Sequence, residues 1–201
     1  MTGNLPSVDP AREMRQLVEA GRYREVLDVH KRTGDPVARQ PEVELLAATA
    51  ATRLGELDTG VRLAESALEH FRARADADGR MRAMNLLGAI AFDHGRLEDA
   101  ERCFADALDR ARSLNDTRMA AHASNNLASV AHLRSRPDVA LSLYRTALLD
   151  YQRLGDRRQR QRPDHAIVFQ AIGALELLHA RTGLRPELAI GGERRQARRE
   201  P

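Results

Sequence analysis

The sequence contains few of the residues that cross-link proteins or build sheets. Among its 201 residues there is one cysteine, no tryptophan and only 3% aromatic residues. Cys103 has no second cysteine to pair with, so nothing indicates an oxidising compartment. Alanine, leucine, arginine and glutamate dominate instead, which favours helices over strands.

Long apolar runs are also absent. The first residues, MTGNLPSVDPAREM, contain no apolar core of a secretion signal. No stretch approaches the roughly 18 uninterrupted apolar residues of a membrane span. We therefore expect a soluble cytoplasmic protein without a membrane partner.

The net charge of +3 hides an uneven distribution of charge. Eight arginines lie in two short runs, within residues 157–162 and 194–199, and subtracting these eight from +3 leaves −5 for the rest. The runs could bind nucleic acid or an acidic protein. We favour a solvated loop and a disordered tail, because no aromatic residue interleaves with either run to stack on bases.

What the sequence does contain is a repeat of 40 residues, counted from Gly55, Gly95 and Ser135. The positions that match in the three units are Leu57/Leu97/Pro137, Gly60/Ala100/Ala140, Ala64/Phe104/Tyr144, Ala67/Ala107/Ala147, Leu68/Leu108/Leu148 and Asp76/Asp116/Asp156. A fixed period of this length indicates a solenoid, in which no unit buries its apolar face alone. Apolar residues recur at steps of three and four, so each unit is predicted to be a helical hairpin. Small residues at Gly88 and Ala100 would let its two helices approach, with Phe104 filling the gap between hairpins.

The strongest unit resembles the tetratricopeptide repeat. Its matching residues are Met84, Leu87, Gly88, Ala91, Gly95, Leu97, Ala100, Phe104 and Ala107. The long period and the Asn125-Asn126-Leu127-Ala128 stretch resemble the variant found in kinesin light chains and in MalT-type bacterial regulators. The resemblance covers about residues 10–182. It implies an all-α fold, a right-handed solenoid of antiparallel helical hairpins forming an α-α superhelix.

We expect a flexible N-terminus at residues 1–9 and a repeat domain at 10–190. Its hairpins are predicted at about 10–33, 41–75, 80–114 and 118–154, followed by an incomplete fifth at 163–190 and a basic disordered tail at 191–201. The fifth hairpin has an apolar first helix but a very short second one. An open end of this kind exposes apolar surface, so self-association through the C-terminal end is a further expectation.

Residues that could support catalysis are sparse. His122 and His132 are ten residues apart, and no histidine or cysteine spacing resembles a closed zinc site. Cys103 adjoins the packing residue Phe104, which favours a buried, inert thiol. There is no glycine-rich phosphate loop. We expect no metal, no cofactor and no catalytic activity.

The resemblance places a binding groove on the inner face of the first helices. The groove residues that it implies are Arg82, Asn85, Phe92, His122, Asn125, Ser129 and His132. An asparagine side chain offers a donor and an acceptor, which suits the backbone of an extended peptide. The groove would therefore bind a peptide or protein segment. The alternatives are that these residues are merely solvated, or that the chain is a sensory or regulatory repeat region that acts through ligand binding or self-association.

Overall fold

The turns between helices set the 40-residue period. In the computed structural model, Gly55, Gly95 and Ser135 each adopt a positive φ, at 80°, 72° and 56°. After Gly55, the amide of Glu56 reaches back to the carbonyl of Ala51 at 2.9 Å, which satisfies a carbonyl that the helix end leaves unpaired. The turn positions on which the repeat was aligned are thus the ends of the first helices.

The structure describes residues 9–35 and 40–154. The helices in these ranges are α1 (Pro10–Glu19), α2 (Tyr23–Arg32), α3 (Pro41–Arg53), α4 (Leu57–Ala73), α5 (Ala77–Asp93), α6 (Leu97–Ser113), α7 (Thr117–Leu133) and α8 (Pro137–Arg153). No strand occurs within these ranges. The expected fifth hairpin, the tail and both arginine runs lie outside the described residues, as does most of the expected flexible N-terminus.

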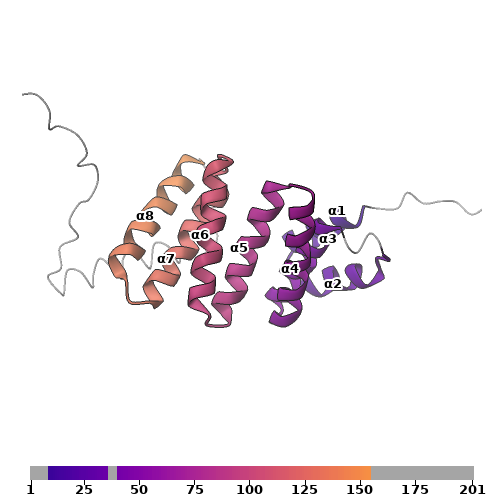
Figure 1. Ribbon diagram of the computed structural model, residues 1–201. Helices are drawn as coiled ribbons and strands as arrows, with labels where there is room; N and C mark the ends of the chain where they lie inside the picture. Colours follow the sequence, from indigo (N-terminus) through magenta and orange to yellow (C-terminus); the bar gives the residue numbers. More distant parts are fainter. Residues whose placement is uncertain (1–8, 36–39, 155–201) are drawn as a thin grey trace, which may run out of the picture.

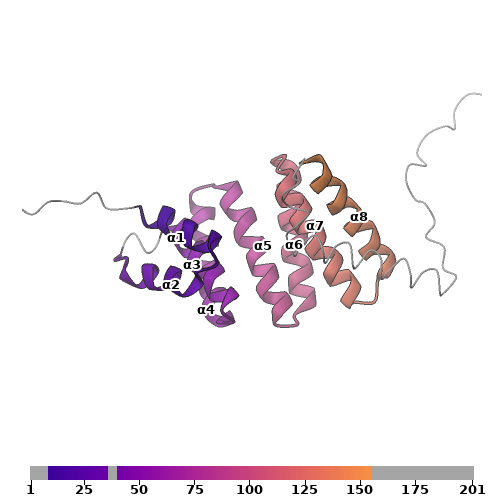
Figure 2. The same ribbon diagram turned by 180° about the vertical axis from the view of Figure 1, so that it is seen from behind.

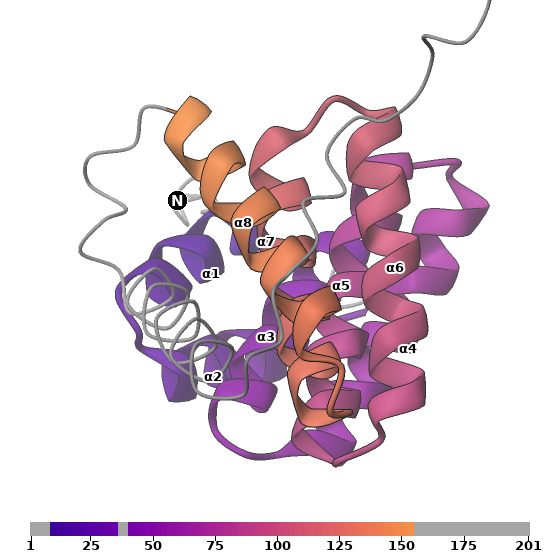
Figure 3. The ribbon, with the colours of Figure 1, turned by 90° about the vertical axis from the view of Figure 1, so that its left-hand side faces the viewer.

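The helices form an extended row of antiparallel pairs in which consecutive helices are neighbours (Figures 1 and 2). Seen along the row from the α8 end, α4 and α6 lie on one side, and α1 and α3 on the other (Figure 3). The contacts of α3 with α1 and α5, and of α5 with α7, place the first helices of the hairpins, α1, α3, α5 and α7, in one row. The prediction of an all-α repeat solenoid is confirmed.

The repeated aspartates cap the first helices. The Asp76 carboxylate accepts a hydrogen bond from the Gly79 amide at 2.8 Å, and Asp116 does the same for Met119 at 3.0 Å. These caps begin α5 at Ala77 and α7 at Thr117. The cap at Asp76 begins α5 ahead of the predicted start at about 80, whereas α7 begins close to the predicted start at about 118.

Small residues on the first helices receive large ones from the second helices. A Cβ added at Gly88 would lie 2.7 Å from the Phe104 ring, so only glycine allows this approach. Phe104 is 2% exposed and also packs in the cluster that contains Val130 of the next hairpin. The predicted role of Phe104 between hairpins is confirmed.

Candidate functional site

The predicted groove residues lie on α5 and α7, at spacings that place them along one side of each helix. His132 is exposed, whereas the other six are partly buried. Phe92 packs at the edge of the Phe104 cluster. The polar members differ in what they contact: Arg82 contacts carboxylates, whereas Asn85 contacts a neutral amide of α7.

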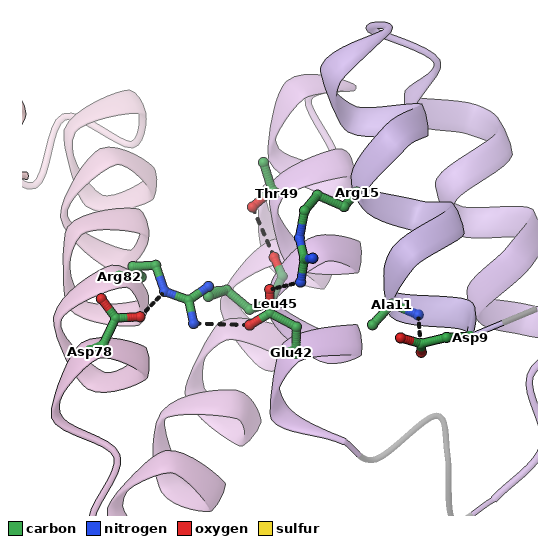
Figure 4. Close-up of polar contacts among 8 residues, drawn as sticks. All are labelled: Asp9, Ala11, Arg15, Glu42, Leu45, Thr49, Asp78 and Arg82. Carbon is green, nitrogen blue, oxygen red and sulfur yellow. Dashed lines mark hydrogen bonds and ion pairs between the residues drawn. The ribbon is translucent and has the colours of Figure 1, made fainter. Parts of the chain in front are cut away.

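Arg82 is part of an ionic cluster that links three first helices (Figure 4). Its Nη2 donates to Glu42 Oε2 at 2.9 Å, and its Nε donates to Asp78 Oδ2 at 2.8 Å. Arg15 of α1 donates to the other oxygen of Glu42 at 3.1 Å. Glu42 on α3 therefore receives one arginine from each neighbouring first helix.

The surroundings favour the charged forms of both partners. Burial by itself would raise the pKa of Glu42, but the hydrogen bonds and charges of Arg82 and Arg15 outweigh it and hold that pKa below its ordinary value. Burial would likewise lower the pKa of Arg82, yet Glu42 and Asp78 raise it. The Arg82 guanidinium also lies over the Phe71 ring of α4, 5.6 Å from its centroid. Arg82 is thus held by α3, α4 and α5 together.

The contact between α5 and α7 uses neutral amides. Asn126 Nδ2 donates to Asn85 Oδ1 at 3.2 Å. The neighbouring Asn125 has its Oδ1 buried without a hydrogen-bond partner in the described part of the chain. The two predicted asparagines therefore have different surroundings, although they stand at the same repeat position.

Two tyrosines of α8 reach the polar residues of α7. The Tyr151 hydroxyl lies 3.0 Å from His122 Nδ1, and the two rings meet edge to face. The Tyr144 hydroxyl lies 3.1 Å from Ser129 Oγ, which also contacts the Asn125 carbonyl. These hydroxyls orient His122 and Ser129 from within the same hairpin.

Sequence reasoning missed several of these partners. It did not predict the pairing of Glu42 with Arg82, and it gave Asn126, Tyr144 and Tyr151 no place in the groove. The pairing of Glu42 with Arg82 had a signal, since opposite charges stand 40 residues apart at the same repeat position. The pair formed by Asn85 and Asn126 is offset by 41 residues and has no such signal.

Two further side chains, Cys103 and Glu44, are of types that can act in catalysis or bind a metal. Cys103 is half-buried, and burial is the main cause that raises the pKa of its thiol, which disfavours the reactive thiolate. Glu44 is buried and accepts from Ser66 Oγ at 2.8 Å, with His70 Nδ1 at 2.9 Å. In residues 9–35 and 40–154 no group of three or more His, Cys, Asp or Glu side chains could hold a metal ion.

The sequence led us to expect no membrane-spanning segment. Among the helices described, none is both long enough and apolar enough to cross a bilayer.

Comparison with known proteins supports the fold and the repeat family. Residues 41–113, which span α3 to α6, match the family model of the tetratricopeptide repeat. The crystal structure of BtubC (BKLC) from P. vanneervenii is similar, with a TM-score of 0.62 at 20% identity over 94% of this chain and 82% of that one. No curated protein matches the sequence.

The structural likeness concerns the fold alone, because the identity is low. The family match covers two complete hairpins, and the same hairpin architecture continues on both sides of it. The resemblance to the tetratricopeptide repeat is therefore confirmed for residues 41–113, which match the model of that family and lie within an all-α repeat solenoid.

Proposed function

We propose that the protein is a non-catalytic interaction module that binds a peptide or protein segment along the row of first helices. Tetratricopeptide repeats are generally protein-interaction modules, which supports the broad assignment. The polar residues of α5 and α7 support the finer one. We assign the binding site to Asn85, Asn125, Asn126, His122 and Ser129.

The amide pair between α5 and α7 carries this assignment. Because Asn126 donates to the Asn85 oxygen, Asn85 Nδ2 and Asn126 Oδ1 keep a donor and an acceptor without another hydrogen bond in the described residues. Both side chains are only partly buried. A donor beside an acceptor matches the carbonyl and the N–H of an extended peptide backbone.

The ionic cluster between α3 and α5 makes Arg82 a weaker candidate for binding a ligand. Arg82 already faces two carboxylates, from Glu42 and Asp78, so its charge is balanced within the chain. An acidic ligand would have to compete with both. The preference for acidic ligands that Arg82 would supply is therefore weakened, and we place binding on the α5–α7 side.

The test begins with an affinity pull-down that names a partner, followed by measurement of its Kd. An Asn85→Ala/Asn126→Ala variant removes both halves of the pair and leaves neither amide unmatched. Each hydrogen bond lost to the partner should cost about 1 kcal/mol, or roughly fivefold in Kd. Gln152→Ala, which removes an exposed amide from α8, is the matched control and should bind like the parent.

A deletion of residues 193–201 separates this site from the arginine tail. If the deletion abolishes binding while the double asparagine variant binds like the parent, the site on α5 and α7 is wrong. The tail would then become the site to study.

A further inference from the structure

The hairpins are joined unequally on the two sides of the array. Each second helix packs against the next first helix, as in the pairs α2–α3, α4–α5 and α6–α7. The contacts between α3 and α5 are far sparser than those between α4 and α5, whereas α1 packs on α3 about as extensively as α2 does. Side chains that bridge α3 and α5 therefore have a large influence on how far these two helices stand apart, while the contacts of α4 act as the pivot.

The bridge between α3 and its neighbours is a line of alternating charges. Arg15, Glu42, Arg82 and Asp78 follow one another with contacts of 3.1, 2.9 and 2.8 Å (Figure 4). We call these four residues the Glu42 brace. Each arginine binds a different oxygen of Glu42, so one carboxylate holds α1 and α5 on opposite sides of α3.

The brace is partly shielded from solvent at its centre. The Glu42 and Arg82 side chains are 26% and 31% exposed, whereas Arg15 is 54% exposed. Charges that are partly buried attract each other more strongly than fully solvated ones, yet dissolved ions still reach them and weaken the attraction. The strength of the brace should therefore depend on the salt concentration.

We propose that the Glu42 brace sets the spacing between α3, with α1 packed on it, and α5, and that ionic strength tunes this spacing. The curvature of a solenoid follows from a small rotation at each repeat, so a weaker attraction along one row lets that row open about the opposite contacts. The joint between α5 and α7 uses neutral amides and should not respond. This inference requires no partner and stands apart from the proposed function.

The test measures distances between spin labels on the full chain, with Cys103→Ser to remove the native thiol. One label pair, Glu19→Cys and Asp93→Cys, reports on the ends of α1 and α5. A second pair, Asp93→Cys and Leu133→Cys, reports on the equivalent ends of α5 and α7. All three positions are exposed and lie at helix ends.

Glu42→Gln should lengthen or broaden the α1–α5 distance, by on the order of 1–2 Å as helices shift at an interface. Raising salt to about 1 M, where screening acts within about 3 Å, should move the parent in the same direction. The α5–α7 distance should stay unchanged in both cases. Glu101→Gln is the matched control, because Glu101 also binds two arginines, Arg134 and Arg136, but lies on the second helix α6.

An unchanged α1–α5 distance in both Glu42→Gln and high salt, with helical content intact, would overturn the proposal. Equal changes at both label pairs would overturn it as well, because they would show general loosening. If Glu42→Gln does not fold, Arg15→Gln removes only the more exposed branch, and the salt titration of the parent requires no substitution in the brace.

Discussion

The joint between the second and third hairpins and the joint between the third and fourth share one backbone design but differ in chemistry. Between α3 and α5 the bridge is ionic and runs from Glu42 to Arg82. Between α5 and α7 it is a neutral amide pair, from Asn126 to Asn85. A repeat thus preserves helix positions, while the contact across each joint can change character from one unit to the next.

The second helices show the same divergence in the sizes of their side chains. At the earlier joint, the large Phe71 of α4 packs on Gly79 of α5. At the later joint, the equivalent residues are Ala111 and Met119, which lie in one packing cluster. The large residue has moved from one helix to the other, so the space is filled in both cases.

The largest expected effect comes from placing the alanine and methionine of the later joint at the positions of Phe71 and Gly79 in the earlier joint. A Cβ at Gly79 would lie 2.1 Å from the Phe71 ring, so Gly79→Met should destabilise by about 3 kcal/mol. Phe71→Ala alone leaves a cavity and should cost a similar amount, about 3–5 kcal/mol. The double variant reproduces the Ala–Met arrangement and should be more stable than either single variant. Urea unfolding of the parent, both single variants and the double variant measures the coupling between the two positions. Additive losses of stability would show that Phe71 and a methionine at position 79 do not compete for the same space.

A second test concerns a polar defect at the later joint. Ser124 is fully buried, and its Oγ has no hydrogen-bond partner in the described chain, whereas Met84 stands at this position in the preceding unit. Ser124→Ala removes the unpaired hydroxyl and should stabilise by about 1 kcal/mol in thermal or urea unfolding.

Ser129→Ala is the matched control for Ser124→Ala. The Ser129 hydroxyl is bonded to Tyr144 and to the Asn125 carbonyl, so its removal should bring no gain. Loss of stability in Ser124→Ala, or an equal gain in both variants, would count against an unpaired hydroxyl at this joint.

The smallest expected effect is a pH dependence of stability, which should arise at the ionic joint of Glu42 and not at the amide joint. The pKa of Glu42 is lower in the folded protein than its ordinary value, so ionised Glu42 stabilises the fold above that ordinary value. This contribution is lost as the pH falls through the folded-state pKa. The parent should therefore exceed Glu42→Gln in stability near neutral pH by less than about 1 kcal/mol, as expected for a partly exposed pair.

The difference should shrink as the pH falls below the ordinary pKa of glutamate, and it should disappear below the folded-state pKa, where Glu42 is protonated. Unfolding curves of the two proteins across this range provide the measurement. Glu65→Gln, which removes an exposed carboxylate from α4, controls for the change in net charge. A gap between parent and Glu42→Gln that stays constant to low pH would show that the brace does not stabilise through ionised Glu42.

The local features of the fold were largely predictable. Gly55 and Gly95 mark turns because glycine tolerates positive φ without a Cβ clash. Ala75, Asn115 and Ser135 also adopt positive φ, although alanine and serine rarely do. The 40-residue alignment located the turn at Ser135 without any preference of serine for positive φ, because the surrounding helices impose the conformation.

The candidate site was predictable only in part. Helical spacing and the family resemblance selected Arg82, Asn85, His122 and the other groove residues. Neither showed that Arg82 is bound to Glu42 and Asp78, or that His122 contacts Tyr151. Such contacts depend on how neighbouring helices are placed, which a single helix pattern does not contain.

By itself, the sequence determined the period, the helical hairpins and the alternation of small and large residues in the core. These features follow from turn chemistry, capping and the 3.6-residue helical period, which act over a few neighbouring residues. Only the tertiary structure decided which repeat positions meet: Glu42 contacts Arg82 at an offset of 40, and Asn85 contacts Asn126 at an offset of 41. The reason is that the rotation between hairpins arises from packing of the whole interface, so a shift of one residue changes the partner without changing the repeat.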